Sequence, residues 1–152
     1  MPNWRDELID AVKTRVERDA EEAAKHKQRV LEALASAETA LGLAIEALKF
    51  GHERIAEKGQ DAKFLDETEE VASDGDLPGG KRTKLARLSL GNLSVAIELD
   101  RATAVIKVSF LEGKPREFDF ARDRHIAAAD VEDYVGRRVV ELVRSAQKAS
   151  PW

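Results

Sequence analysis

Residues 88–110 read LSLGNLSVAIELDRATAVIKVSF, and this stretch decides the class of fold. Apolar and polar side chains alternate along most of it, which is typical of β-strands that bury one face. Gly91-Asn92 breaks the alternation with a two-residue hairpin signal. Asp100-Arg101 breaks it again, and a new alternating run follows. The stretch therefore predicts consecutive antiparallel strands joined by short turns.

A further strand is expected after the turn formers of residues 112–115, which read EGKP. Phe118 and Phe120 then occupy one set of alternate positions, and Glu117 and Asp119 occupy the other. This pattern again places apolar side chains on one face only. We therefore expect a four-stranded antiparallel meander with one buried face.

The sequence after the strands changes to the spacing of a helix. From Ala127 to Gln147, apolar residues recur every three or four positions, and charged residues occupy most of the remaining ones. We expect this C-terminal helix to pack on the apolar face of the sheet. The predicted fold class is therefore α+β.

Helical spacing also marks the region before the strands. Residues 30–55 read VLEALASAETALGLAIEALKFGHERI and carry apolar residues at heptad spacing in two registers. One register holds large residues and the other holds small ones, which favours close approach of another helix. The large register contains Leu34, Leu41, Leu48 and Ile55, and the small register contains Val30, Ala37, Ala44 and Gly51.

The first part of the helical region is more polar. Asn3 is expected to cap the helix start. The apolar stripe here consists of Trp4, Leu8, Ile9, Val12 and Val16. One unbroken helix over residues 3–58 would be about 80 Å long, which is far more than a short sheet requires. We therefore expect an arm that projects or pairs with itself, and a helical hairpin remains the alternative.

Charge divides the chain into three segments. Residues 1–58, the helical arm, have a net charge of −2, and residues 59–80, an acidic and flexible connector, have −6. Residues 81–152, the sheet and C-terminal helix, have +4. Because the arm is expected to pack partly on the sheet, we predict one structural domain.

Composition excludes several classes of protein. The chain has no cysteine, which excludes disulfides, thiolate catalysis and zinc–thiolate sites. Its start lacks the basic and apolar regions of a signal peptide. The most apolar stretch, residues 31–50, contains Glu32, Glu38 and Glu46 and does not predict a membrane span. We expect a soluble, cytoplasmic protein without membrane association.

No motif predicts a cofactor or a metal. Residues 75–83 read GDLPGGKRT, which nearly matches a phosphate-binding loop, but Arg82 stands where the loop needs Ser or Thr to bind magnesium. Asp74 and Asp76 lack the further oxygen ligands of a calcium loop. The three histidines are far apart in the sequence and form no ligand pair.

The function expected from this pattern is that of a non-catalytic protein-interaction or assembly module. In this interpretation the helical arm self-associates or binds another helical protein. The predicted seam consists of Val30, Leu34, Ala37, Leu41, Ala44, Leu48 and Ile55. The competing interpretation is that the same stripe packs on the chain's own sheet, because a core-facing helix has the same spacing.

Two further functions remain as alternatives. A small-molecule binder or enzyme would use a groove between sheet and helix near His125, with Arg122, Asp123 and Tyr134 beside it. A nucleic-acid-associated protein would use two basic faces. The first face contains Lys81, Arg82, Lys84 and Arg87, and the second contains Arg137, Arg138 and Arg144. All of these except Arg144 are also the candidate anion-binding residues. Only 5% of the residues are aromatic, so a base-stacking platform and nucleic-acid binding are not favoured.

Overall fold

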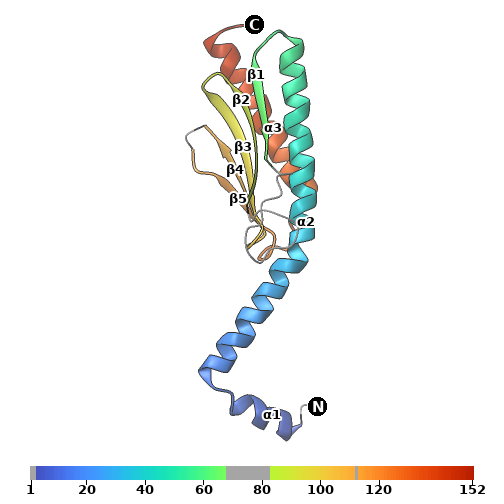
Figure 1. Ribbon diagram of the computed structural model, residues 1–152, viewed down its shortest axis with the longest axis vertical. Helices are drawn as coiled ribbons and strands as arrows, with labels where there is room; N and C mark the ends of the chain where they lie inside the picture. Colours follow the sequence, from blue (N-terminus) through green and yellow to red (C-terminus); the bar gives the residue numbers. More distant parts are fainter. Residues whose placement is uncertain (1–2, 68–82, 112) are drawn as a thin grey trace.

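The computed structural model describes residues 3–67, 83–111 and 113–152. It has an α+β fold, as predicted: an antiparallel sheet, two long helices packed on it, and an N-terminal helical segment that extends beyond the sheet (Figure 1). The helices are α1 (Trp4–Ala11), α2 (Arg15–Glu57) and α3 (Ala128–Ala149). The strands are β1 (Ala62–Asp66), β2 (Thr83–Leu90), β3 (Leu93–Asp100), β4 (Val105–Phe110) and β5 (Arg116–Asp119).

The sheet is a meander of five strands in the order β1-β2-β3-β4-β5, with every neighbouring pair antiparallel. The prediction of four strands was wrong because it left out β1. The hairpin at Gly91-Asn92 is present: Leu90 pairs with Leu93, and Gly91 has a φ of 61°. Such a positive φ is one that glycine adopts without strain.

Strand β1 lies inside the segment that we expected to be a connector. Its five residues pair with β2, with Ala62 opposite Leu90 and Phe64 opposite Leu88. Helix α2 also holds this strand, because a ring nitrogen of His52, Nε2, lies 2.9 Å from the Ala62 carbonyl oxygen. The Phe64 ring lies 6.2 Å from the His52 ring. The strand is therefore fixed by its neighbours rather than by a strong pattern of its own.

The remainder of the expected connector, residues 68–82, lies outside the described residues. This segment includes most of the GDLPGGKRT stretch, the acidic pair Asp74 and Asp76, and the basic residues Lys81 and Arg82.

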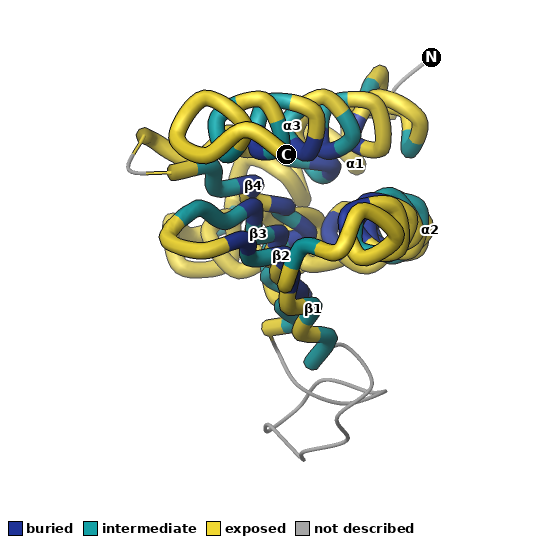
Figure 2. Tube along the Cα trace, turned by 90° about the horizontal axis from the view of Figure 1, so that it is seen from above, coloured by how far each residue is buried: buried dark blue, intermediate teal, exposed yellow. Residues whose placement is uncertain are grey.

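Helices α2 and α3 cover the apolar face of the sheet. Figure 2 shows both helices against the strands, with the buried residues gathered between these elements. Ala86, Ile97 and Val108 form one row across β2, β3 and β4, and all three are buried. The helix residues facing this layer are also fully buried, and they include Leu48 and Ile55 of α2. The core therefore uses one face of the sheet and two helices.

Helix α2 lies close to α3 at Gly51. A Cβ atom added there would lie 2.6 Å from Cγ1 of Val139 and 3.4 Å from Cδ2 of Leu88. Only glycine leaves room for this crossing. A small residue in the heptad stripe thus allows close helix packing, here against a helix of the same chain.

An ion pair fixes α2 against the end of β3. Arg101 follows β3 and is only 5% exposed, and its Nε atom donates a hydrogen bond of 3.0 Å to Oε1 of Glu38. Arg101 is the one charged residue of the described ranges that is buried to this extent. The Asp100-Arg101 turn therefore belongs to the core as well as to the meander.

The N-terminal region is two helices rather than one. Helix α1 ends at Ala11, and α2 begins after Thr14, whose Oγ1 accepts a hydrogen bond of 3.2 Å from the Glu17 backbone N–H. Thr14 and Glu17 have the spacing of a capping box, which stabilises a new helix start at this point. Asn3 caps α1 as predicted, accepting a hydrogen bond of 3.1 Å from the backbone N–H of Arg5.

The part of the helical region that lies beyond the sheet is residues 3–29, which we call the free arm (Figure 1). All of its residues are exposed except Lys13, which is half-buried. The first buried residue is Val30, where α2 meets the rest of the protein. The arm expected over residues 1–58 therefore projects only in its first half.

Candidate interaction surfaces

The predicted seam is part of this chain's own core. Six of its seven residues are buried against the sheet and α3, and the seventh, Leu34, is half-buried and packs on the same cluster. The six are Val30, Ala37, Leu41, Ala44, Leu48 and Ile55. Of the two interpretations of the heptad stripe, the structure supports the core interpretation, and these side chains offer no free seam to a second helix.

The free arm, by contrast, keeps its apolar stripe in solvent. Trp4 is 66% exposed, Ile9 60% and Val16 77%. Leu8 and Val12 are also more than half exposed. Trp4, Leu8 and Ile9 lie on α1, Val12 follows its last residue, and Val16 lies on the first turn of α2. Helix α1 has no buried residue at all. A row of large apolar side chains left in water is a feature of interaction sites.

The polar side of α1 is acidic. Asp6, Glu7 and Asp10 lie opposite or beside the stripe at helical spacing. The guanidinium of Arg5 lies 5.5 Å from the centre of the Trp4 ring, so the basic residue of this helix sits next to the apolar side. The arm therefore ends in an amphipathic helix with acidic flanks.

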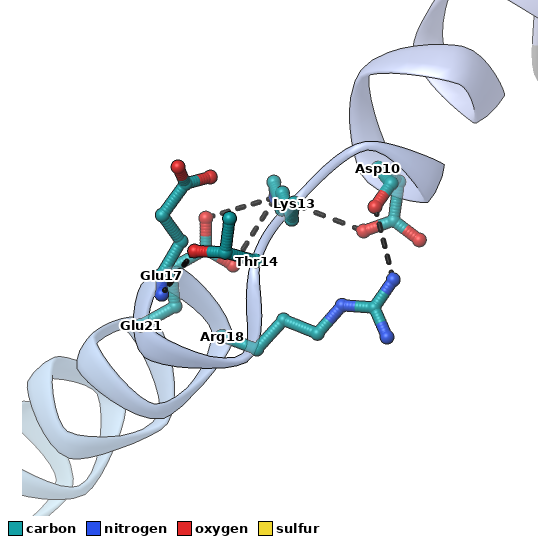
Figure 3. Close-up of polar contacts among 6 residues, drawn as sticks. All are labelled: Asp10, Lys13, Thr14, Glu17, Arg18 and Glu21. Atoms are coloured by element: carbon teal, nitrogen blue, oxygen red, sulfur yellow. Dashed lines mark hydrogen bonds and ion pairs between the residues drawn. The ribbon is translucent and has the colours of Figure 1, made fainter.

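Polar contacts hold the junction between α1 and α2 (Figure 3). Nη2 of Arg18 donates a hydrogen bond of 3.1 Å to the Asp10 carbonyl oxygen. Nζ of Lys13 lies 2.8 Å from Oε1 of Glu21 and 3.7 Å from Oδ1 of Asp10. The hydrogen bond that Lys13 donates to the Glu21 carboxylate raises the pKa of Lys13 above its usual 10.5. These contacts favour one orientation of α1 relative to α2.

A second apolar surface is a groove between α2 and α3, which we call the α2–α3 groove. Its floor contains Ala47, Gly51, Val139 and Val143. Phe50, Val140 and Trp152 line it and are 59%, 47% and 39% exposed. The charged residues that line it are Glu46, Arg54, Lys58, Glu132, Asp133, Arg137 and Arg144. The groove opens to solvent because the buried sides of both helices face the sheet.

Of the four residues proposed for a site near His125, the structure brings three together and places Tyr134 elsewhere. Oδ1 of Asp123 accepts a hydrogen bond of 2.9 Å from the backbone N–H of His125, so this bond stabilises the loop and does not involve the imidazole. Tyr134 lies elsewhere: its ring is 5.6 Å from that of Phe118, and the guanidinium of Arg138 lies 4.7 Å from the Tyr134 ring centre. Tyr134 is therefore not part of a site with His125, whereas Arg122 and Asp123 lie beside it.

His125 shares a hollow with His26 and Arg29 of α2. The hollow has a volume of about 490 Å³ and is lined by His26, Arg29, Ala121, Arg122, Asp123, Arg124 and His125. Arg122 also lies 3.7 Å from Oδ2 of Asp119. The loop after β5 and the exposed part of α2 thus bring three guanidinium groups together.

The two predicted basic faces do not form a continuous surface in the described residues. Lys84 lies on the helix-covered side of the sheet and is half-buried, whereas Arg87 is exposed on the opposite side. On α3, Arg137 pairs with Asp133 at 2.9 Å and Arg138 with Glu141 at 2.9 Å. Lys81 and Arg82 lie outside the described residues.

In the described ranges, with the gaps at 68–82 and 112, no group of His, Cys, Asp or Glu side chains has an arrangement that holds a metal ion. None of the helices described above has the length and apolar composition needed to cross a membrane.

The chain matches no protein-family model, and no curated protein and no solved structure is significantly similar to it. Functional interpretation therefore depends on the surfaces described above.

Sequence reasoning missed the α2–α3 groove because its residues come from three distant parts of the chain. Phe50 lies on α2, Val140 on α3 and Trp152 after α3. A signal was present in each helix, since Phe50 and Val140 are large apolar residues outside the buried stripes. Only the packing of α2 on α3 shows that they share one surface.

Proposed function

We propose that this protein is a non-catalytic assembly module that self-associates through its free arm, residues 3–29. The observation that supports this proposal is the apolar stripe of the arm, which the rest of the chain leaves exposed. Apolar surface of this kind is stabilised by burial against a partner. The function expected from sequence is retained, but its contact surface moves from the buried stripe to residues 4–16.

The size of the stripe supports a pairwise contact. Full burial of a large aliphatic or aromatic side chain stabilises by about 1.5–3 kcal/mol, and the stripe has five such residues. Association costs about 4–15 kcal/mol in lost translational and rotational freedom. One stripe only just offsets that cost, so an assembly in which two copies each bury an arm is favoured.

The charges on the arm favour a protein partner over a lipid surface. Helices that bind membrane surfaces carry Lys and Arg on their polar face, which attract anionic lipids. The polar side of α1 carries Asp6, Glu7 and Asp10 instead. Anionic lipid would be repelled by this side of the helix.

Size-exclusion chromatography with light scattering tests the proposal. The wild-type protein is expected to be a dimer or a higher oligomer at micromolar concentration. Leu8→Glu/Ile9→Glu is expected to shift it to a monomer, because both side chains are exposed and contribute nothing to the core. A wild-type protein that stays monomeric at high micromolar concentration would contradict the proposed function.

Leu65→Glu is the matched control. Leu65 is an apolar residue of β1 with 43% exposure, and it points to the side of the sheet that the helices leave open. The same change of side chain there is expected to leave the oligomeric state unchanged. Circular dichroism would verify that all variants keep their helices.

A second candidate function is the binding of a small anion in the hollow beside His125. Arg29, Arg122 and Arg124 line it, with Asp123 as the acidic residue among the lining residues. Such clusters suit phosphate or carboxylate groups. Titration with inorganic phosphate, followed by NMR, is expected to shift the amide signals of residues 121–126, and Arg29→Ala/Arg124→Ala is expected to abolish the shifts. Shifts that persist in this variant would contradict specific binding.

A further inference from the structure

We infer that the α2–α3 groove binds helix α1 of a second copy, so that two copies exchange their arms. This inference rests on the proposed function and names the surface that receives the arm. Three observations carry it: the apolar character of both surfaces, the charges beside them, and the distance between the arm and the groove of the same chain.

Both surfaces are apolar and of similar extent. Helix α1 has eight residues and is therefore about 12 Å long. The groove extends along α2 from Glu46 to Lys58, which is about 18 Å of helix. A short helix that lies between two others can pack its stripe on both of them, as in helical bundles. The groove therefore has room for α1 and an apolar floor for its side chains.

Charges at one end of the groove are complementary to those of α1, whereas Glu46, Glu132 and Asp133 line the groove elsewhere. Arg54, Lys58 and Arg144 lie toward the C-terminal end of the groove. The acidic residues Asp6 and Glu7 flank the apolar stripe of α1. Rim charges of opposite sign add mainly to the rate and specificity of association.

The arm cannot reach the groove of its own chain. Only three residues, 12–14, separate α1 from α2, and α2 is one continuous helix. From Arg15 to Glu46 this helix rises by about 46 Å. Because α1 is far shorter than this distance, it cannot fold back to cover residues 46–58. Helix α1 of the same chain is therefore not the occupant of the groove, and α1 of a second copy can be.

If two copies exchange their arms, each copy covers the apolar side of α1 and the α2–α3 groove of the other, and the assembly is closed. If α1 of one copy lies in the groove of its partner, two-fold symmetry places the partner's α1 in the groove of the first copy. No apolar stripe or groove then remains open for further copies. The expected assembly is a dimer, held by two equivalent arm–groove contacts.

Two variants of the full-length chain test the exchange. The arm variant is Leu8→Glu/Ile9→Glu, and the groove variant is Phe50→Glu/Val140→Glu. All four side chains are exposed, so both variants are expected to fold. Each variant alone is expected to be monomeric, with the dissociation constant of the dimer raised at least about a hundredfold. Light scattering measures the mass of each.

Mixing the two variants is the decisive measurement. The groove variant keeps an intact arm, and the arm variant keeps an intact groove. Their mixture is therefore expected to form a heterodimer with one functional contact, weaker than the wild-type dimer. Arm–arm pairing predicts no heterodimer, since one partner always has a damaged arm.

The outcomes separate the inference from the proposed function. If the wild type is dimeric and only the arm variant is monomeric, the arm self-associates but the groove is not its site. If the arm variant remains dimeric, the proposed function itself is overturned. Sedimentation of the wild type with vesicles of phosphatidylcholine and phosphatidylserine, lost in the arm variant, would show that the arm binds lipid instead.

Charge reversal independently tests how α1 of one copy is oriented in the groove of the other. Asp6→Lys/Glu7→Lys is expected to weaken the dimer severalfold, and Lys58→Glu/Arg144→Glu is expected to do the same. A chain carrying all four changes restores opposite charges across the contact and is expected to recover most of the affinity. Further weakening in the fourfold variant would contradict the proposed placement of α1.

Discussion

Helix α2 has two halves that share one continuous backbone and differ in almost everything else. Residues 15–29 are exposed on all sides and carry charged side chains on most of their surface. Residues 30–57 contribute nine buried residues to the core, of which one is Gly51. The comparison shows that the helix does not end where the core ends. Its first half is stabilised locally, by the Thr14 cap and by contacts such as that between Lys13 and Glu21.

The largest expected difference between the halves is in the free energy of unfolding. Leu48 is fully buried, and Leu48→Ala is expected to destabilise the protein by about 2–5 kcal/mol because it leaves a cavity in the core. Leu8→Ala, at a residue that is 53% exposed, is expected to change the stability of the monomer by less than about 0.5 kcal/mol. Chemical denaturation at low protein concentration measures both.

A smaller loss in the free energy of unfolding is expected when the ion pair that fixes the second part of α2 is removed. Glu38→Gln removes the charge that faces the buried Arg101 guanidinium at 3.0 Å. Hydrogen bonds to charged groups contribute about 1.5–3 kcal/mol, and Glu38 is partly exposed, so we expect a loss near the lower end. Thermal unfolding would measure it. An unchanged midpoint would show that Arg101 is held by its other surroundings.

Two glycines in the packed part of α2 are expected to respond in opposite ways to substitution by alanine. Gly51→Ala is expected to destabilise by about 1–2 kcal/mol, because the new Cβ meets Val139 at 2.6 Å. Gly42 has nothing within 4 Å of its Cβ position, so Gly42→Ala is expected to stabilise by up to about 1 kcal/mol through helix propensity. Denaturant midpoints of the two variants should move in opposite directions.

The smallest effect on the free energy of unfolding is expected for a substitution at the start of the exposed part of α2, residues 15–29. Thr14→Ala removes the cap of α2, which is worth about 1 kcal/mol locally. The global free energy of unfolding should hardly change, because residues 15–29 are all exposed and contribute nothing to the core. Amide hydrogen exchange is expected to become faster at residues 15–18 and to stay unchanged beyond residue 30. Faster exchange throughout α2 would show that the two halves unfold together.

Much of the sheet could be predicted from sequence because alternation is a local signal. Ile97 and Leu99 of β3 alternate with Ala96, Glu98 and Asp100 and are buried as expected. Strand β1 could not be predicted with the same ease. It offers only Ala62 and Phe64 as inward residues, and its partner, β2, follows after an intervening segment. The start of α2 was in principle visible in the spacing of Thr14 and Glu17.

The interaction surface was harder to predict for a physical reason. A helix that packs on its own sheet and a helix that pairs with a partner both need an apolar stripe at the same spacing. The stripe containing Leu41 and Leu48 is buried in the core, while the shorter stripe containing Leu8 and Ile9 is exposed. Spacing alone cannot tell these two cases apart, because the answer depends on how far the sheet extends along α2.

The two tryptophans of the chain, Trp4 and Trp152, give the molecule an optical property of its own. Trp4 lies on α1, and Trp152 lines the α2–α3 groove near the opposite end of the molecule (Figure 1). Both indole rings are partly in water, so the separated chain should emit at long wavelength. An arm seated in a groove would move both rings into an apolar environment and shift the emission to shorter wavelength. Dilution of the unlabelled protein would then report its own dissociation as a change in fluorescence.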